Sequence, residues 1–264
     1  MRNPGVQVAE ALVKVATWNV NGIRRRHAEV VDWIAEGAPD VVCLQELKAS
    51  AEQVPEALTA LRDYWSMWHG APNGYSGVSL HLKRSICTAE PMFTHPEFDF
   101  ECRVVEARTG SVRWLSVYVP NGGKDYAAKL SFLQVLRDYV RALHAAGDQV
   151  VLCGDMNVAR EEIDVHPSQR DPERVGQRPD ERALFDELVG SGLVDVGRAC
   201  DPTNERNFTW WPYWRQARAR NLGWRLDYVL ATESVAAHAR SAVVGRTLGT
   251  SDHAPVTVDL DMAP

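Results

Sequence analysis

The feature that most constrains this chain is an apolar run at Val150–Cys153 that ends in a glycine and two polar side chains. A continuous apolar run is typical of a buried strand, and Gly154 marks a tight turn at its end. Side chains two apart in an extended segment lie on the same side, so Asp155 and Asn157 can face one spot. The same pair also suits an ordinary turn in which Asp and Asn bond the local backbone. This stretch alone leaves both interpretations open.

Length and composition indicate an ordinary globular protein. The 264 residues contain 45% hydrophobic and 24% charged residues, with no internal repeat or low-complexity linker. We therefore expect one domain over residues 1–264, with a core from about 13 to 260. No apolar run approaches the roughly 20 residues of a membrane span, and the first residues lack the apolar region of a signal peptide. The five cysteines form no CxxC pair. We expect a monomeric cytoplasmic protein with reduced cysteines and no membrane contact.

The charge and the tryptophans bear on possible partners. A net charge of −6 argues against coating nucleic acid by bulk charge, but it allows a local basic face and fits a carboxylate metal site. Four of the nine tryptophans fall within the fifteen residues 210–224, and residues 208–220 interleave aromatics with arginines. Aromatic faces can accept a base or a sugar while arginines hold phosphates. The alternative is a loop whose aromatics pack on the core.

The order of elements predicts the fold class. We expect helices at 24–35, 125–145 and 181–188, a capping box at Ser50 and Gln53, and no regular element at 161–179. Strands are expected at 12–18, 40–44, 64–68, 77–82, 102–108, 112–119, 150–153, 225–231 and 254–260. Strands and helices alternate until the strands dominate, which favours two packed sheets with helices outside.

Polar residues follow the apolar runs at five places: Asn19, Glu46, Tyr118, Asp155 and the Ser251–His253 segment. Ligands of α/β sheets bind at strand ends, where loops carry chemistry on a rigid frame. Five polar strand ends in one chain favour one shared site over five unrelated turns.

Two of these places suggest specific chemistry. Glu46 follows a fully apolar strand and is a candidate Mg²⁺ ligand, with Asn19 and Asp252 as additional ligands, because Mg²⁺ prefers oxygen atoms. The alternative for Glu46 is a loop acid in water. His253 gains a role if Asp227 orients it, because a carboxylate on one ring nitrogen favours imidazolium, which stabilises charge on a phosphate. The alternatives are a packing histidine and an Asp227 paired with a neighbouring arginine.

Seven motifs occur in the order of one known family. They are residues 19–24 (NVNGIR), 44–48 (LQELK), 118–122 (YVPNG), 154–157 (GDMN), 192–195 (GLVD), 223–228 (GWRLDY) and 251–256 (SDHAPV). The chain resembles the exonuclease III-type apurinic/apyrimidinic endonucleases of the endonuclease/exonuclease/phosphatase superfamily, from about Val13 to Leu260. The resemblance implies a DNase I-like, four-layered α/β sandwich of two packed mixed sheets flanked by helices. It also implies Mg²⁺-dependent cleavage (Mn²⁺ as a substitute) of damaged double-stranded DNA 5′ to an abasic site, with 3′→5′ exonuclease and 3′-end-cleaning activity.

The resemblance also implies roles for single residues. The metal site would comprise Glu46, Asn19 and Asp252, with Asp155, Asn157 and His253 close by. Asp155 would activate water or protonate the leaving group, Asn157 would hold the phosphate or nucleophile, and His253 with Asp227 would contact the phosphate. Tyr118 would hydrogen-bond the phosphate or act as a phenolate. The DNA contacts and the walls of an abasic-sugar pocket would come from Asn121, Lys124, Trp210, Trp224 and Leu226.

Three departures from the family pattern remain. Leu47 stands where the bacterial enzymes usually have threonine, and we expect it to point into the core. Tyr118 begins a motif closer to the animal-type enzymes. Lys124 stands near the position at which some relatives have an arginine that enters the DNA helix. A lysine side chain is less suited to that insertion, because it lacks the planar guanidinium of arginine. Two alternatives are another phosphoesterase of the superfamily, such as a DNase I-like nuclease, and a catalytically silent nucleic-acid-binding regulator on the same scaffold.

Overall fold

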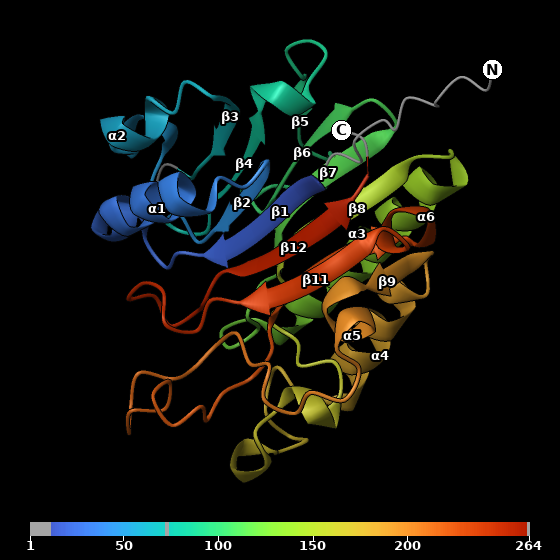
Figure 1. Cartoon of the computed structure of the whole chain (residues 1–264). Helices are drawn as coiled ribbons and strands as arrows, with labels where there is room; N and C mark the ends of the chain where they lie inside the picture. Colours follow the sequence, from blue (N-terminus) through green and yellow to red (C-terminus); the bar gives the residue numbers. More distant parts are fainter. Residues whose placement is uncertain (1–11, 72–73, 263–264) are drawn as a thin grey trace, which may run out of the picture.

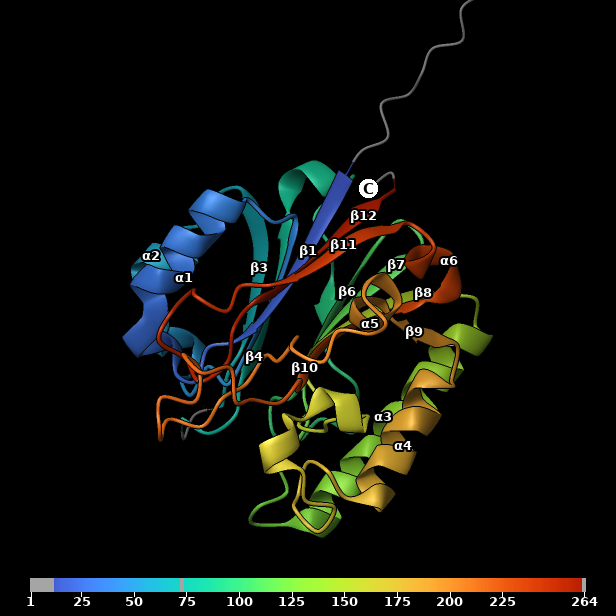
Figure 2. The same ribbon diagram turned by 60° about the horizontal axis from the view of Figure 1, so that its bottom comes forward.

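The structure is a computed structural model that describes residues 12–71 and 74–262. Two six-stranded mixed sheets pack face to face, and helices cover the outer face of each (Figures 1 and 2). The four layers of helix, sheet, sheet and helix confirm the α/β sandwich expected from the sequence. No helix within the described ranges is long and apolar enough to cross a membrane.

The first sheet contains the chain's N-terminal and C-terminal strands side by side. Its strand order is β11 (Ala239–Val244), β12 (Val256–Asp261), β1 (Leu12–Asn19), β2 (Val41–Gln45), β4 (Val78–Lys83) and β3 (Tyr64–His69). Only β1 and β2 are parallel neighbours, so β1, β2 and β3 all run in the same direction.

The second sheet repeats this plan. Its strand order is β5 (Phe93–Thr94), β6 (Val104–Thr109), β7 (Val112–Tyr118), β8 (Gln149–Asp155), β10 (Asp227–Thr232) and β9 (Leu193–Asp195). Here β7 and β8 are the parallel pair, and β5 runs in the same direction as they do. Each sheet therefore directs the ends of several strands toward one rim.

Each sheet has its own helical cover (Figure 2). The helices α1 (Ile23–Gly37) and α2 (Glu56–Thr59) cover the first sheet, and α3 (Tyr126–Ala145) and α4 (Pro179–Val189) cover the second. Two short helices, α5 (Val196–Cys200) and α6 (Glu233–Ala236), lie beside β9 and β10. The alternation of each strand explains the layers: Val13 and Val15 of β1 point between the sheets, whereas Ala16 and Trp18 pack toward α1.

The layer between the sheets is the largest apolar cluster. Cys43 of β2 and Cys153 of β8 are buried in it, and all five cysteines are free. This agrees with the expectation of reduced cysteines, although Cys200 is exposed rather than in the core. Burial of both faces explains why β2 is apolar up to Gln45 and β8 is apolar from Val150 to Cys153.

Five local expectations need correction. Strand β11 was not expected, because it is a half-exposed edge strand whose apolar and polar residues follow no clear period. Strands β5 and β9, two and three residues long, were also not expected. The segment 161–179 holds two 3₁₀ turns, Glu162–Asp164 and Pro167–Gln169, which are too short to show periodicity. Helix α1 includes Gly37, and its left-handed C-cap is Ala38, with φ 42°.

Candidate active site

The polar strand ends of both sheets meet at one rim of the sandwich. Asp155 ends β8, and its register pairs it with Tyr118 of β7 on one side and Asp227 of β10 on the other. Asn19 ends β1 in the opposite sheet and donates a hydrogen bond across to Asp155. The expected convergence of these strand ends is therefore present in the structure.

Gly154 allows the close approach that places Asp155. A Cβ at Gly154 would lie 1.8 Å from the carbonyl oxygen of Val117, so no other residue fits without moving the backbone of β7 or β8. The Asp155 carboxylate then accepts hydrogen bonds from Asn19 Nδ2 at 2.8 Å and from the backbone N–H of Asn157 at 2.9 Å. The second bond is the local turn contact that the sequence left open, and the reactive role of Asp155 and Asn157 stays a prediction.

Burial raises the pKa of Asp155 to about 7. The value of about 7 is the net result: His253 and the hydrogen bond from Asn19 lower this pKa, while the negative charges of Asp227 and Glu46 act in the same direction as burial. Asp155 is fully buried. Near neutral pH this carboxyl can therefore either hold or release a proton, a property of groups that transfer protons in catalysis.

His253 is held between two carboxylates. Its Nδ1 lies 2.8 Å from Asp227 Oδ2, and its Nε2 lies 3.8 Å from Asp155 Oδ2. Burial lowers the pKa of His253, but Asp227 and Asp155 outweigh burial and raise that pKa to about 10. The ring is therefore an imidazolium at neutral pH. Because Asp227 is paired with His253, the alternative of an Asp227–arginine pair is wrong.

The neighbouring arginine has other partners. Arg225 bonds Asp164 at 2.7 Å and Asp195 at 2.7 Å. One oxygen of Asp227, Oδ1, is buried and has no hydrogen-bond partner among the described residues. Asp227 thus relies on His253 for most of the compensation of its charge.

Glu46 follows β2 in a left-handed conformation, with φ 52°. Its carboxylate accepts from Asn19 Nδ2 at 2.9 Å and pairs with Lys48 Nζ at 2.6 Å. Burial raises the pKa of Glu46, but Lys48 and Asn19 outweigh it and the net pKa is lowered. Glu46 is therefore ionised, and its side chain is only 15% exposed, which disfavours the alternative of a loop acid in water. Leu47 is completely buried, as expected, so its side chain points away from this site.

The donor set fits a divalent cation. Glu46, Asp155 and His253 offer one ligand atom each, all within 4.8 Å of one another. Two of the three ligand atoms are carboxylate oxygens, the ligand type that a hard divalent cation such as Mg²⁺ prefers. Asp252 lies beside this group, where it accepts from Asn21 at 2.7 Å and from the Trp210 indole at 3.1 Å. Asp252 is not one of the three clustered residues, so its ligation stays a prediction.

Tyr118 lies next to the carboxylates. Burial, followed by the charges of Glu46 and Asp155, raises its pKa well above the ordinary value. The hydroxyl therefore keeps its proton, which favours the hydrogen-bonding role over the phenolate. The guanidinium of Arg103 lies over the Tyr118 ring, 5.0 Å from its centre, in a cation–π contact that helps to hold the ring in place.

An aromatic pocket opens onto the same cluster. A cavity of about 320 Å³ is lined by Trp210, Trp224 and Leu226 together with Asn121, Glu46, Asp252 and His253. The two indoles meet edge to face at 5.2 Å. A second cavity of about 400 Å³, which contains Lys124, shares Glu46 and Asn121 with the first. All five residues expected at the DNA therefore line this groove.

The structure adds a pocket wall that the sequence did not reveal. Arg174, Val175 and Gly176 line the aromatic pocket, and the Arg174 guanidinium lies 4.8 Å from the centre of the Trp224 ring. No periodic or motif signal marks this loop.

Glu181 holds that loop in place from the start of α4. It accepts from the backbone N–H of Gly176 at 2.5 Å and pairs with the buried Lys129, which in turn donates to the Asn157 carbonyl at 2.7 Å. Lys129 falls on the apolar face of α3, four residues before Leu133. A charged residue at a core position is the signal that could have found this pair.

Comparison with known proteins identifies the family. The model of the endonuclease/exonuclease/phosphatase family matches residues 16–253. The chain belongs to this family. Recombination repair protein 1 of Drosophila melanogaster is 35% identical over 251 residues, which are 93% of this chain but only 37% of that protein, so the chain spans little more than a third of this relative. The exodeoxyribonuclease of Bacillus subtilis is 31% identical over 257 residues, which are 95% of this chain and 100% of that protein.

Solved structures agree. An AP endonuclease from Archaeoglobus fulgidus superposes with a TM-score of 0.85 at 32% identity, covering 95% of this chain and 100% of the other. A variant of the 3′ phosphatase NExo from Neisseria, bound to a product DNA hairpin, gives 0.84 at 30% identity and covers 94% and 99%. The chain is thus an enzyme of the exonuclease III and AP endonuclease type, in a family of metal-dependent nucleases. A silent regulator on this scaffold is not supported, because the site's polar residues are all present.

Proposed function

We propose that this nuclease uses Mg²⁺ to cleave damaged double-stranded DNA on the 5′ side of an abasic site, leaving a 3′-hydroxyl. We further propose 3′→5′ exonuclease and 3′-end-cleaning activity at the same site. The observation that carries the proposal is the position of the aromatic pocket. One cavity of about 320 Å³ contains both the Trp210–Trp224 walls and the His253 that would face the phosphate.

The residues that would hold the ion are Glu46 and Asp155, with Asn19, Asn157 and Asp252 beside them. His253 completes the cluster, but its imidazolium has no free lone pair, so the ring would face the phosphate and would bind the ion only after losing its proton. Carboxylate and amide oxygens suit Mg²⁺, and Mn²⁺ accepts the same ligands. The bound ion would polarise the scissile phosphate as a Lewis acid.

The chain's own groups supply the remaining chemistry. The pKa of Asp155, about 7, suits a group that takes a proton from water or gives one to the leaving oxygen. The His253 imidazolium and the Tyr118 hydroxyl would both face negative charge on the phosphate, where preorganised donors stabilise a transition state most. Asn157, which donates to Asp155 at 3.2 Å and to the Val119 carbonyl at 2.9 Å, would keep this geometry fixed.

The pocket supplies selectivity. Trp224 and Leu226 are almost completely buried and form an apolar floor, and Trp210 forms a partly exposed lip. Such a floor suits the apolar face of a deoxyribose, and extruding a nucleotide costs least where base pairing is already lost. Relatives named as AP endonucleases, and one bound to a DNA hairpin, support this substrate class.

The test compares two duplexes that differ only in one tetrahydrofuran abasic analogue. We expect a single nick 5′ to the analogue with Mg²⁺, none with chelator, and much slower cleavage of the undamaged duplex. Absence of cleavage over a range of Mg²⁺ and Mn²⁺ concentrations would refute the proposal. Equal cleavage of both duplexes would instead indicate a DNase I-like nuclease without abasic specificity.

A further inference from the structure

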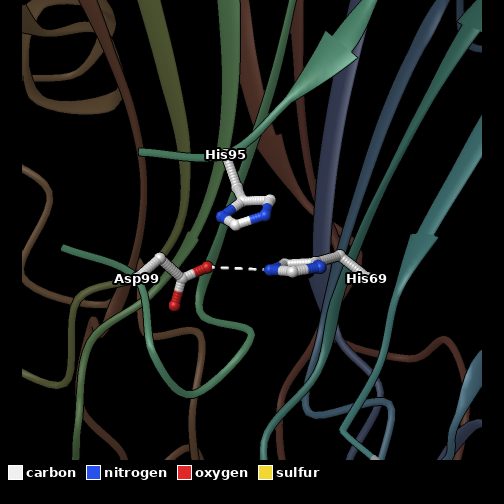
Figure 3. A group of neighbouring side chains, drawn as sticks. All are labelled: His69, His95 and Asp99. Atoms are coloured by element: carbon white, nitrogen blue, oxygen red, sulfur yellow. Dashed lines mark hydrogen bonds and ion pairs between the residues drawn. The ribbon is translucent and has the colours of Figure 1, made fainter. Parts of the chain in front are cut away.

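A second cluster of possible metal ligands lies at the outer edge of both sheets (Figure 3). His69 is the last residue of β3, an edge strand of the first sheet, and His95 follows β5, an edge strand of the second. Asp99 lies in the loop between β5 and β6. Because β3 and β5 run parallel to β2 and β7, this cluster lies at the same end of the sandwich as the catalytic residues but on its edge strands.

The three side chains point toward one another. His69 Nε2 lies 2.9 Å from Asp99 Oδ2, and the rings of His69 and His95 are stacked with their centres 4.6 Å apart. One ligand atom from each residue lies within 4.8 Å of the other two. Asp99 is buried, His69 is half-buried and His95 is exposed, so the cluster opens to solvent on the His95 side.

Asp99 is a preformed acceptor. Its carboxylate accepts from the backbone N–H of Arg103 at 2.8 Å, of Val104 at 2.9 Å and of Glu101 at 3.3 Å. Burial raises the pKa of Asp99, but the contact with His69 and these backbone bonds outweigh burial, so the net pKa is lowered. The loop therefore folds around an ionised carboxylate whose Oδ2 faces the two histidines.

We propose that His69, His95 and Asp99 bind a transition-metal ion, Zn²⁺ foremost, at a site separate from the catalytic centre. Two imidazole nitrogens and one carboxylate oxygen suit Zn²⁺, with solvent as the fourth ligand, whereas Mg²⁺ takes oxygen ligands. The ion takes the place of the proton between His69 and Asp99, and that proton leaves to solvent or moves to His69 Nδ1.

The observed spacing requires one movement. Ligand atoms of a tetrahedral zinc site lie roughly 3.3 Å apart, since each is about 2.0 Å from the ion. The His69–Asp99 pair at 2.9 Å is already close to that spacing. The His95 ring must leave its stacked position and turn a nitrogen toward the ion, and its exposure gives it room to do so.

The bound ion would join the two sheets at their edges and stiffen the loop 95–103. That loop leads to the active site, because Arg103 donates its backbone N–H to Asp99 while its guanidinium lies over Tyr118 and reaches the hydroxyl of Tyr75 at 3.0 Å. Tyr75, Glu101 and Arg103 line the larger cavity of the groove. The site therefore has a structural role at one wall of the DNA-binding groove.

The test measures how much Zn²⁺ the protein retains after equilibrium dialysis in excess Mg²⁺. The midpoint temperature of thermal unfolding is a second measurement. Glu46→Gln is the background, because it weakens ion binding at the catalytic cluster. We expect one Zn²⁺ per chain and a raised midpoint in this background. Adding His95→Ala should weaken Zn²⁺ binding more than about tenfold and abolish the rise, since it removes a direct ligand. Adding His238→Ala, which changes an exposed histidine elsewhere, should alter neither.

Co²⁺ gives an independent reading, because its visible absorption is intense only in a tetrahedral protein site. We expect that absorption in Glu46→Gln and its loss with His95→Ala. Equal Zn²⁺ binding with and without His95, or no bound Zn²⁺ in the Glu46→Gln background, would overturn the proposal. Mg²⁺-dependent cleavage by the single variant His95→Ala should persist in metal-free buffer supplemented with Mg²⁺, which separates this site from the proposed nuclease function.

Discussion

Two histidine–carboxylate pairs with nearly the same nitrogen–oxygen distance lie at the same end of the sandwich. His253 lies 2.8 Å from Asp227 in the centre, and His69 lies 2.9 Å from Asp99 at the edge. They differ in how the carboxylate is satisfied. Asp99 accepts hydrogen bonds from three backbone N–H groups, whereas Asp227 Oδ1 has no partner within the part of the chain that the structure describes.

We infer that this difference separates a structural carboxylate, Asp99, from the proposed catalytic one, Asp227. The backbone holds Asp99 whether or not His69 is charged, so the edge pair organises a loop and is prepared to accept a cation. Asp227 depends on His253, and the second carboxylate at Asp155 makes the imidazolium still more favourable. The central pair thus keeps a charged ring at a fixed position, as transition-state stabilisation of a phosphate requires.

The largest expected effect is on the rate. His253→Asn should lower single-turnover cleavage of an abasic duplex by roughly 10²–10³, because it removes a preorganised cationic donor. His69→Asn, the matched change at the edge, should leave the rate close to that of the wild type in Mg²⁺. Binding of abasic DNA should persist in both variants, as measured in chelator. Loss of binding together with activity in His253→Asn would mean that the ring holds DNA or the fold rather than the transition state.

The next effect is on the free energy of unfolding, to which both carboxylates contribute. Asp99→Asn should lower the free energy of unfolding by about 2–4 kcal/mol, because one acceptor oxygen becomes an amide that faces backbone N–H groups and the bonds lose their charge. Asp227→Asn should also lower stability near neutral pH, because the buried His253 imidazolium loses its main partner, but unlike Asp99→Asn it should lower the cleavage rate as well. Urea unfolding in chelator measures both. A cleavage rate that fell as far in Asp99→Asn as in Asp227→Asn would contradict the assignment of structural and catalytic roles.

The convergence of polar strand ends at one rim could be predicted from the sequence because the signal for each end is local. A polar residue directly after an apolar strand needs no knowledge of distant partners, and Asn19, Glu46, Tyr118 and Asp155 all show it. The partner of Asp227 was left open between a histidine and an arginine. Sequence patterns could not decide this, since His253 is 26 residues away and Arg225 only two.

The edge cluster and the loop wall depend on packing between distant segments. His69 and His95 are brought together only because β3 and β5 are edge strands of two different sheets, and no spacing rule encodes which edges coincide. Arg174 reaches Trp224 through a loop that the buried pair of Lys129 and Glu181 fixes. A buried charge on an apolar helix face was visible in the sequence, but its partner 52 positions later was not.

The last expected effect is the pH dependence of stability in chelator, where the two pairs act on opposite sides of neutrality. The pKa of His253 is about 10 in the folded chain, against roughly 6.5 for an unperturbed histidine. Between these values the folded chain holds the additional proton, so the free energy of unfolding should fall as pH rises through this window. His253→Asn should flatten that decline.

Asp99 acts on the acid side. Its lowered pKa means that the folded chain holds fewer protons than the unfolded chain below roughly pH 4, so its contribution is lost as pH falls there. Urea midpoints from pH 3 to 10 therefore distinguish the pairs: Asp99→Asn should flatten only the acid limb, and His253→Asn only the alkaline limb. If either variant flattened both limbs, the two pairs would be coupled through the loop that carries Arg103 to Tyr118, and the centre and the edge would form one electrostatic unit.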